Sequence, residues 1–148
     1  MGRGAGHVTG PLRGATIVTL ALAALARPVL AENAAPSGPA IPVPSGVEVH
    51  WLETLSDTQG PEGLTLRFRF VAPQVAGPGY DPDKAATDMQ ALCDTFALPR
   101  LSDLGPQPAQ VVIALADRVV PYGEIDEEAV QFFEAYSVAD GSCVWELF

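Results

Sequence analysis

The residues after position 31 that could do chemistry are few. His50 lies on the polar side of a segment that alternates as a strand does, and Arg67 and Arg69 lie on the polar side of a second such segment. Residues two apart on a strand share a face. His50, Arg67 and Arg69 therefore form a candidate anion-binding face, with cross-strand ion pairing as the plainer interpretation.

Cys93 and Cys143 are the two cysteines of the chain. An even number of cysteines in an exported protein favours a disulfide. Closing a loop of about 50 residues would stabilise the fold by roughly 4 kcal/mol in the loop-entropy model. A pair of buried free thiols is the alternative. A redox-active pair is not favoured, because the sequence has neither a Cys-x-x-Cys motif nor a basic residue beside either cysteine.

The sequence predicts no catalytic residue, no cofactor and no metal. A Ser-His-Asp constellation would need His50, and no Gly-x-Ser-x-Gly motif presents a nucleophile. One histidine and two cysteines cannot supply the ligands of a usual zinc site, and no glycine-rich phosphate loop follows residue 31. We therefore expect a non-catalytic binding or interaction module. A small hydrolase that uses carboxylates with His50, Arg67 and Arg69 is the alternative.

The first thirty-one residues have the order of a secretory signal peptide. Arg3 and Arg13 precede an apolar run over residues 15–26, and small residues at 29 and 31 resemble a cleavage site. An apolar core of about a dozen residues is shorter than the roughly 20 that a membrane-spanning helix needs, although a retained anchor is the alternative. We expect cleavage after about Ala31 and a periplasmic or secreted protein without later membrane insertion.

The charge of the remaining chain restricts its partners. Residues 32–148 hold five basic and eighteen acidic side chains, a net charge of −13. Binding nucleic acid or anionic lipid headgroups requires Lys and Arg side chains that neutralise phosphates. The sequence therefore argues against both partners. It leaves the actual partner unidentified, with a periplasmic protein as one candidate.

Apolar periodicity predicts the elements that position these side chains. Residues 32–46 are rich in proline and are expected to be a tether. Alternation of period two predicts strands over 47–55 and 63–72, joined as a hairpin. In the second strand the apolar residues share one face, and Arg67 and Arg69 lie on the other.

An amphipathic helix is predicted next. The Asp-Pro pair at 81–82 is typical of an N-cap and a first helical position, and the Leu-Pro pair at 98–99 is typical of an end. Cys93 lies on the apolar stripe of this helix. If Cys93 bonds Cys143, the last strand turns Trp145 toward the helix as well.

The C-terminal third is predicted to complete a small sheet. Residues 109–116 are apolar on both faces, as in an interior strand. Residues 130–148 favour a C-terminal hairpin, with a helix over 127–136 as the alternative. The expected fold is a single α+β domain over 47–148 in the order β-β-α-β-β-β. One amphipathic helix would pack across a small antiparallel sheet.

The chain also resembles a family of small exported proteins of unknown function from Rhodobacter-type alphaproteobacteria. The resemblance is carried by residues 63–73, 92–93, 98–99, 106–113, 120–124, 133–136 and 143–146. It implies a shared fold and a shared cysteine pair, and it implies no activity.

Overall fold

The computed structural model describes residues 35–60 and 63–147, together with Gly4, Gly6, His7, Gly10 and Gly14. The predicted signal peptide lies outside this description, apart from those five residues. The unit Glu32–Phe148 is compact by its own contacts. Within the described residues, no helix is both long enough and apolar enough to cross a membrane.

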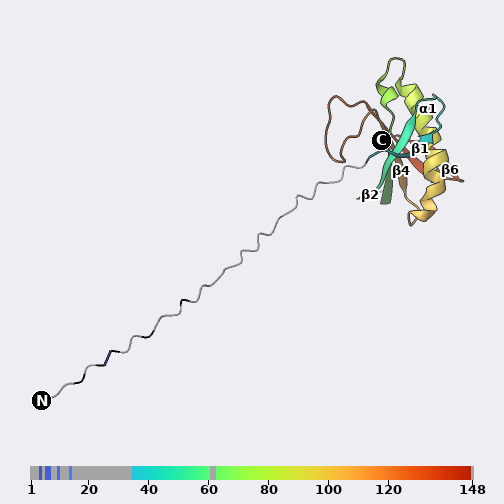
Figure 1. Ribbon diagram of the computed structural model, residues 1–148. Coiled ribbons are helices and arrows are strands. Elements are labelled where there is room, and N and C mark those ends of the chain that lie inside the picture. The colour runs from blue at the N-terminus through green and yellow to red at the C-terminus, as the bar shows by residue number, and fades with distance from the viewer. Residues whose placement is uncertain are drawn as a thin grey trace. The chain divides into compact units, whose positions relative to one another are not determined.

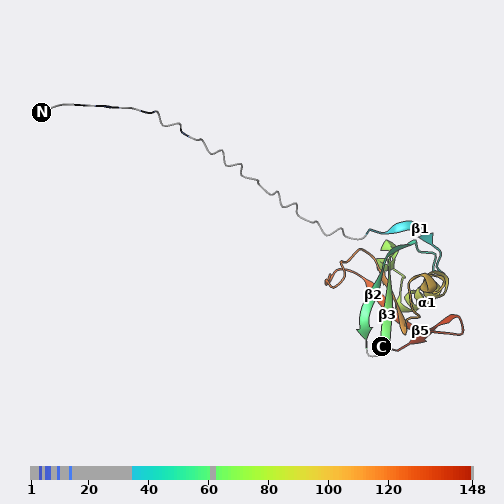
Figure 2. The ribbon, with the colours of Figure 1, turned by 90° about the horizontal axis from the view of Figure 1, so that it is seen from below.

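A six-stranded sheet with strands in sequence order forms the frame of this unit (Figures 1 and 2). Its helical segment, residues 82–103, packs against one face of the sheet. The segment begins as a regular α-helix, continues as a wider π-helical turn and ends as a tighter 3-10 helix. The strands are β1 (Ser37–Ile41), β2 (Val49–Gly60), β3 (Gly63–Val71), β4 (Gln110–Ala116), β5 (Gln131–Ala139) and β6 (Ser142–Glu146). The helical parts are η1 (Pro73–Ala76), α1 (Pro82–Leu92), the π-helical turn η2 (Cys93–Ala97) and η3 (Leu98–Asp103).

The expectation of an antiparallel sheet is wrong, because β3 and β4 run parallel over residues 65–71 and 110–116. The other neighbouring strands are antiparallel, so the sheet is mixed. The reason is the connection: the helical segment carries the chain back along the sheet, so β4 starts at the same end as β3. Alternation of apolar and polar residues predicts which side chains share a face of a strand. It gives no information about whether two strands run parallel or antiparallel.

The expectation of a tether over 32–46 is also wrong, since β1 pairs with β2 within it. The anchor is Asp88 of α1, a fully buried carboxylate. It accepts hydrogen bonds from the Ser45 backbone N–H at 2.9 Å and from the Tyr80 hydroxyl at 2.9 Å. A buried carboxylate must be hydrogen-bonded, so this side chain holds the segment against the helix. Proline is tolerated in β1 because the strand lies at the edge of the sheet.

Several predicted elements are confirmed. The hairpin of β2 and β3 forms, and Leu66, Phe68 and Phe70 are buried on the face toward the helix. The side chain of Asp81 caps α1 by accepting a hydrogen bond from the Lys84 N–H at 2.9 Å. The apolar strand β4 is interior to the sheet, between β3 and β5.

The C-terminal hairpin is confirmed, and 131–139 is strand and not helix. Its turn places Asp140 at φ 51° and Gly141 at φ 72°, the left-handed pair that a two-residue hairpin turn requires. The predicted disulfide joins Cys93 of η2 to Cys143 of β6, with Cα atoms 6.1 Å apart. Asp94 reinforces it by accepting a hydrogen bond from the Cys143 N–H at 3.0 Å.

Candidate functional site

The predicted arginine pair lies on the face of the sheet opposite the helical segment. There Arg69 forms an ion pair with Glu53 of β2 and donates to the carbonyl oxygen of Val120. The guanidinium carbons of Arg67 and Arg69 each lie 5.9 Å from the centre of the Tyr122 ring. The pair is therefore engaged with β2 and with the loop of residues 117–130 that covers this face.

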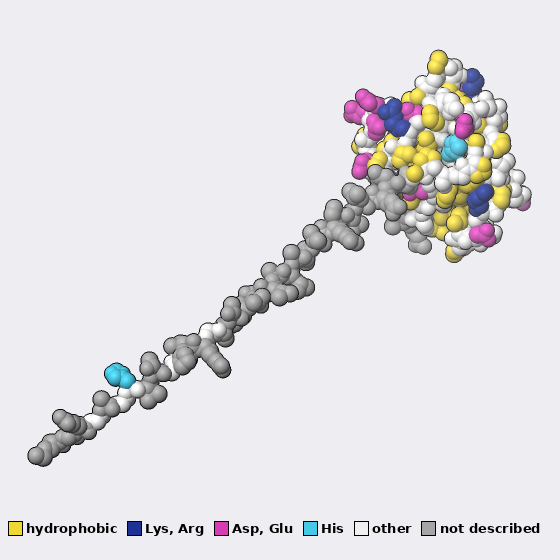
Figure 3. All heavy atoms as spheres, viewed as in Figure 1, with side chains coloured by type: hydrophobic (Ala, Val, Ile, Leu, Met, Phe, Trp, Pro, Cys, Tyr) yellow, Lys and Arg dark blue, Asp and Glu magenta, His cyan; other side chains and the backbone are white. Residues whose placement is uncertain are grey.

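Loop 117–130 is closed at its base by hydrogen bonds. The Asp117 N–H donates to the Val130 carbonyl oxygen, and the Val130 N–H donates to Asp117 Oδ1, both at 3.0 Å. Arg118 bonds Asp117 at 2.9 Å and lies 3.8 Å from Glu128. Loop 117–130 therefore has the form of an Ω-loop, a surface loop whose two ends lie close together. Acidic side chains gather on the loop drawn in brown in Figure 1, as Figure 3 shows.

The electrostatics of the loop base favour an ionised Asp117. Burial of this carboxyl opposes ionisation. The hydrogen bond from Arg118, the hydrogen bond from the Val130 N–H and the charge of Arg118 outweigh that burial and lower the pKa of Asp117. The ionised form of Asp117 is therefore part of what holds loop 117–130 in place.

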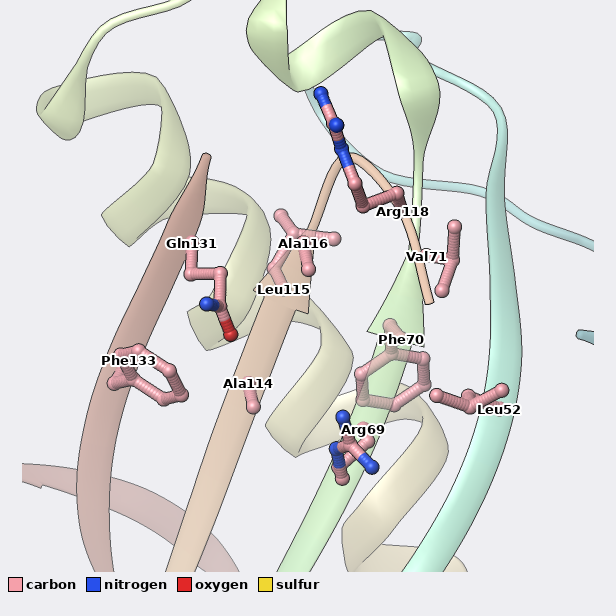
Figure 4. A pocket seen from close by; sticks show the side chains of 10 residues that line it. All are labelled: Leu52, Arg69, Phe70, Val71, Ala114, Leu115, Ala116, Arg118, Gln131 and Phe133. Carbon is pink, nitrogen blue, oxygen red and sulfur yellow. The ribbon is translucent and has the colours of Figure 1, made fainter. Parts of the chain in front are cut away.

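The space beside the arginine pair is small. A cavity of about 10 Å³ is lined by residues of β3, β4 and β5, among them Arg69, Ala114 and Phe133 (Figure 4). That volume is near the minimum for a single water molecule. Arg69 of the predicted anion-binding face therefore makes a cross-strand ion pair with Glu53, and the cavity beside it has room for about one water molecule.

His50 has different partners from Arg69. Its Nε2 lies 3.0 Å from Glu48 Oε1, and its Nδ1 lies 3.3 Å from the Gly38 carbonyl oxygen of β1. Both partners are acceptors, so a protonated ring can donate to both and a neutral ring to one. His50 thus fastens β1 to β2. Among the described residues, no group of three or more His, Cys, Asp or Glu side chains could hold a metal ion.

A larger groove lies at the β1 edge of the sheet, between β1 and β2 on one side and the end of the helical segment on the other. Its volume is about 900 Å³, against about 370 to 450 Å³ for three other hollows of the described surface. All five residues of β1 line this apolar groove. Its remaining walls include Trp51, Phe68, Phe96, Arg100 and Leu104.

Aromatic rings build the inner wall of the apolar groove. The Phe96 ring centre lies 6.3 Å from that of Trp51, 6.4 Å from Phe68 and 5.3 Å from Phe70. The Trp51 Nε1–H donates to Thr54 Oγ1 at 3.1 Å. The polar atom of the indole is therefore satisfied, and its carbon surface is what the groove offers a ligand.

Arg100 sits at the rim of the apolar groove in a fixed position. Its guanidinium carbon lies 3.6 Å from the centre of the Phe96 ring, and its Nη1 donates to the Phe96 carbonyl oxygen at 2.7 Å. Sequence reasoning missed this site because it placed residues 37–42 in a tether. The Phe96 and Arg100 spacing of four was an available signal, since such residues are neighbours on a helix.

The comparisons with known proteins give a family and no activity. The chain matches no curated protein. It also matches no solved structure. The model of one family matches residues 20–148, which is most of the chain. This protein therefore belongs to the family of unknown function DUF6497.

Proposed function

We propose that this protein is an exported binding module whose apolar groove holds a ligand with an apolar body. The single observation that carries the proposal is the groove of about 900 Å³ walled by β1, Trp51 and Phe96. Ligand sites are typically concave, of 300 to 1,000 Å³ and mostly apolar, with a few polar groups at fixed positions. Arg100 is such a group here.

The disulfide and the first thirty-one residues support export. Disulfides persist in oxidising compartments and are rare in the cytosol. Cys93 and Cys143 are joined in this fold, and residues 1–31 have the order of a signal peptide. We infer that residues 32–148 act in the periplasm or outside the cell.

The contacts that Arg69 makes within the protein favour a binding role over hydrolysis. A hydrolase that used His50, Arg67 and Arg69 would need a cleft in which they converge on a substrate. Arg69 instead bonds Glu53 and Val120, beside a cavity of about 10 Å³, and His50 fastens β1. These contacts favour the module.

A neutral apolar fluorophore tests the groove. 1-N-Phenylnaphthylamine gains fluorescence in apolar sites, and we expect it to bind the oxidised protein with a dissociation constant in the micromolar to millimolar range. A Trp145→Phe variant leaves Trp51 as the sole tryptophan, because the chain has two. We expect the dye to quench or shift its emission, since Trp51 lines the groove.

Matched leucine variants locate the dye. Leu104 lines the groove and is 44% exposed, whereas Leu147 is 82% exposed and outside it. We expect Leu104→Glu to weaken dye binding at least about fivefold, because a carboxylate at the rim is hard to desolvate. Leu147→Glu should leave binding unchanged. Equal effects of the two variants, or no dye binding by the unmodified protein, would overturn the proposal.

Localisation is tested separately. Native mass spectrometry of the protein from its own cells gives the site of cleavage and the oxidation state in one spectrum. We expect a periplasmic fraction in which the chain starts near Glu32 and is two hydrogens lighter than the dithiol. A cytosolic protein that keeps residues 1–31 would contradict export and leave the groove proposal standing.

A further inference from the structure

Arg100 lines the apolar groove and is exposed, and its guanidinium contacts the ring and the backbone of Phe96. The guanidinium lies over the Phe96 ring at 3.6 Å and uses Nη1 to bond the Phe96 carbonyl oxygen. A guanidinium has five N–H donors in one plane. Stacking covers a face of that plane and not its edge, so the donors at the edge remain able to bond a ligand.

Arg100 has no carboxylate partner among the described residues, unlike Arg69 and Arg118. Arg69 pairs with Glu53, Arg118 pairs with Asp117, and the Lys84 ammonium donates to the Gly79 carbonyl oxygen. Arg100 contacts the ring and the carbonyl oxygen of Phe96. A positive charge held by a ring and a carbonyl, and lining a groove, is suited to pair with an incoming anion.

The other charges of the groove do not cancel this preference. Glu53 also lines the groove, but its carboxylate is bound to Arg69. Asp103 lines it too, three residues beyond Arg100 at the exposed end of η3. The acidic loop 117–130 covers the face of the sheet opposite the helical segment, whereas Arg100 belongs to the helical segment itself.

We propose that the ligand of the apolar groove is an amphipathic monocarboxylate. Its apolar chain or ring would lie along Trp51 and β1, and its carboxylate would accept hydrogen bonds from the Arg100 guanidinium. This inference rests on the proposed function, because it names the chemical class of ligand for the same groove. A planar carboxylate matches the fork of guanidinium donors in a bidentate pair, which an alcohol or an amine cannot form.

Competition against the neutral dye tests the head group. Decanoate, 1-decanol and decylamine share one apolar chain and differ in charge, and each is used to displace 1-N-phenylnaphthylamine at pH 7.5. We expect decanoate to compete about three- to tenfold better than decanol, the range for a charge-assisted bond at a partly exposed site. Arg100→Gln should remove this advantage, so that decanoate and decanol compete equally.

A charge-matched control and a rescue complete the experiment. Lys84→Gln removes one positive charge outside the groove and should preserve the preference for decanoate. Arg100→Lys keeps the charge without the planar fork and should keep part of the preference. Equal competition by decanoate and decanol in a protein that binds the dye would overturn the inference and leave the proposed function intact. A preference for decylamine that Asp103→Asn removes would also overturn it, whereas the absence of dye binding would overturn the proposed function itself.

Discussion

Replacing Asp88 by alanine should release β1 from the helical segment. Asp88 is fully buried and accepts hydrogen bonds from the Ser45 N–H and the Tyr80 hydroxyl, each at 2.9 Å, as well as from the Ser45 hydroxyl. A buried donor left without its partner costs about 1–3 kcal/mol. Ser45 is exposed and can recover its bonds from water, whereas the half-buried Tyr80 hydroxyl recovers its bond less readily.

We therefore expect Asp88→Ala to lower the free energy of unfolding by about 2–4 kcal/mol, measured by urea denaturation. Asp88→Asn should cost less, because its amide oxygen still accepts one bond and hydroxyl groups can accept from its NH₂. The Ser45 amide should lose its protection from hydrogen exchange in Asp88→Ala. Asp83→Ala is the control, since Asp83 lies in the first turn of the same helix and its interaction with the helix dipole is worth about 0.3–1 kcal/mol.

The result that would refute this reasoning is specific. If Asp88→Ala unfolds within about 1 kcal/mol of the unmodified protein and the Ser45 amide stays protected, Asp88 is not the anchor of the segment. Dye binding gives an independent test of whether Asp88 holds β1 in place. A released β1 removes one wall of the apolar groove, so the same variant should also bind 1-N-phenylnaphthylamine more weakly.

Three further predictions concern the rest of the fold. Replacing Cys93 and Cys143 together by serine should lower the free energy of unfolding by about 4 kcal/mol, because the bond closes a loop of about 50 residues; an unchanged urea midpoint would contradict this. The folded-state pKa of Asp117 lies below its unfolded value, so its contribution to stability is present above about pH 4 and is lost as the pH falls through the folded-state value. Asp117→Asn should flatten that acid dependence in urea titrations at pH 2–5, and identical slopes in the two proteins would argue against it. Arg69→Gln should make loop 117–130 more sensitive to protease, since it loses the bonds to Glu53 and Val120, while dye binding in the groove is retained. Weaker dye binding with unchanged protease sensitivity of loop 117–130 would instead indicate that Arg69 contributes to ligand binding.

Local chemistry explains which elements could be predicted from the sequence. The cap of Asp81, the Asp-Gly turn at 140–141 and the alternation of β3 each depend on neighbouring residues, and each is found as expected. The disulfide followed from the number of cysteines and from the place of Cys93 on the apolar stripe of the helix.

The parallel pairing of β3 and β4, and the strand β1, could not be predicted in this way. Parallel pairing is set by a crossover of nearly forty residues, and no residue within either strand carries it. The order of β1 depends on the buried Asp88, whose hydrogen-bond partner Ser45 is 43 residues away in the chain. The four prolines of residues 36–44, one of which lies in β1, indicate an extended segment, which is true of a tether and of an edge strand alike. The apolar groove was missed for the same reason, because β1 is one of its walls.

Few pairings hold β1 on the sheet, so the position of β1 is coupled to ligand binding. β1 pairs with β2 at two positions, Ser37 with Trp51 and Ile41 with Val49, with an irregularity between them. A ligand that contacts β1 in place and not β1 released stabilises the ordered form, by about 2.7 kcal/mol at a concentration a hundred times its dissociation constant. By reciprocity, a variant that releases β1 weakens the ligand in proportion to the fraction of molecules in which β1 is still in place, so a tenfold fall in that fraction is a tenfold loss of affinity. In Asp88→Asn, hydrogen exchange at the Ser45 amide reports that fraction and the dye titration reports the affinity. A large loss of protection at Ser45 with no change in affinity would show that the ligand does not contact β1.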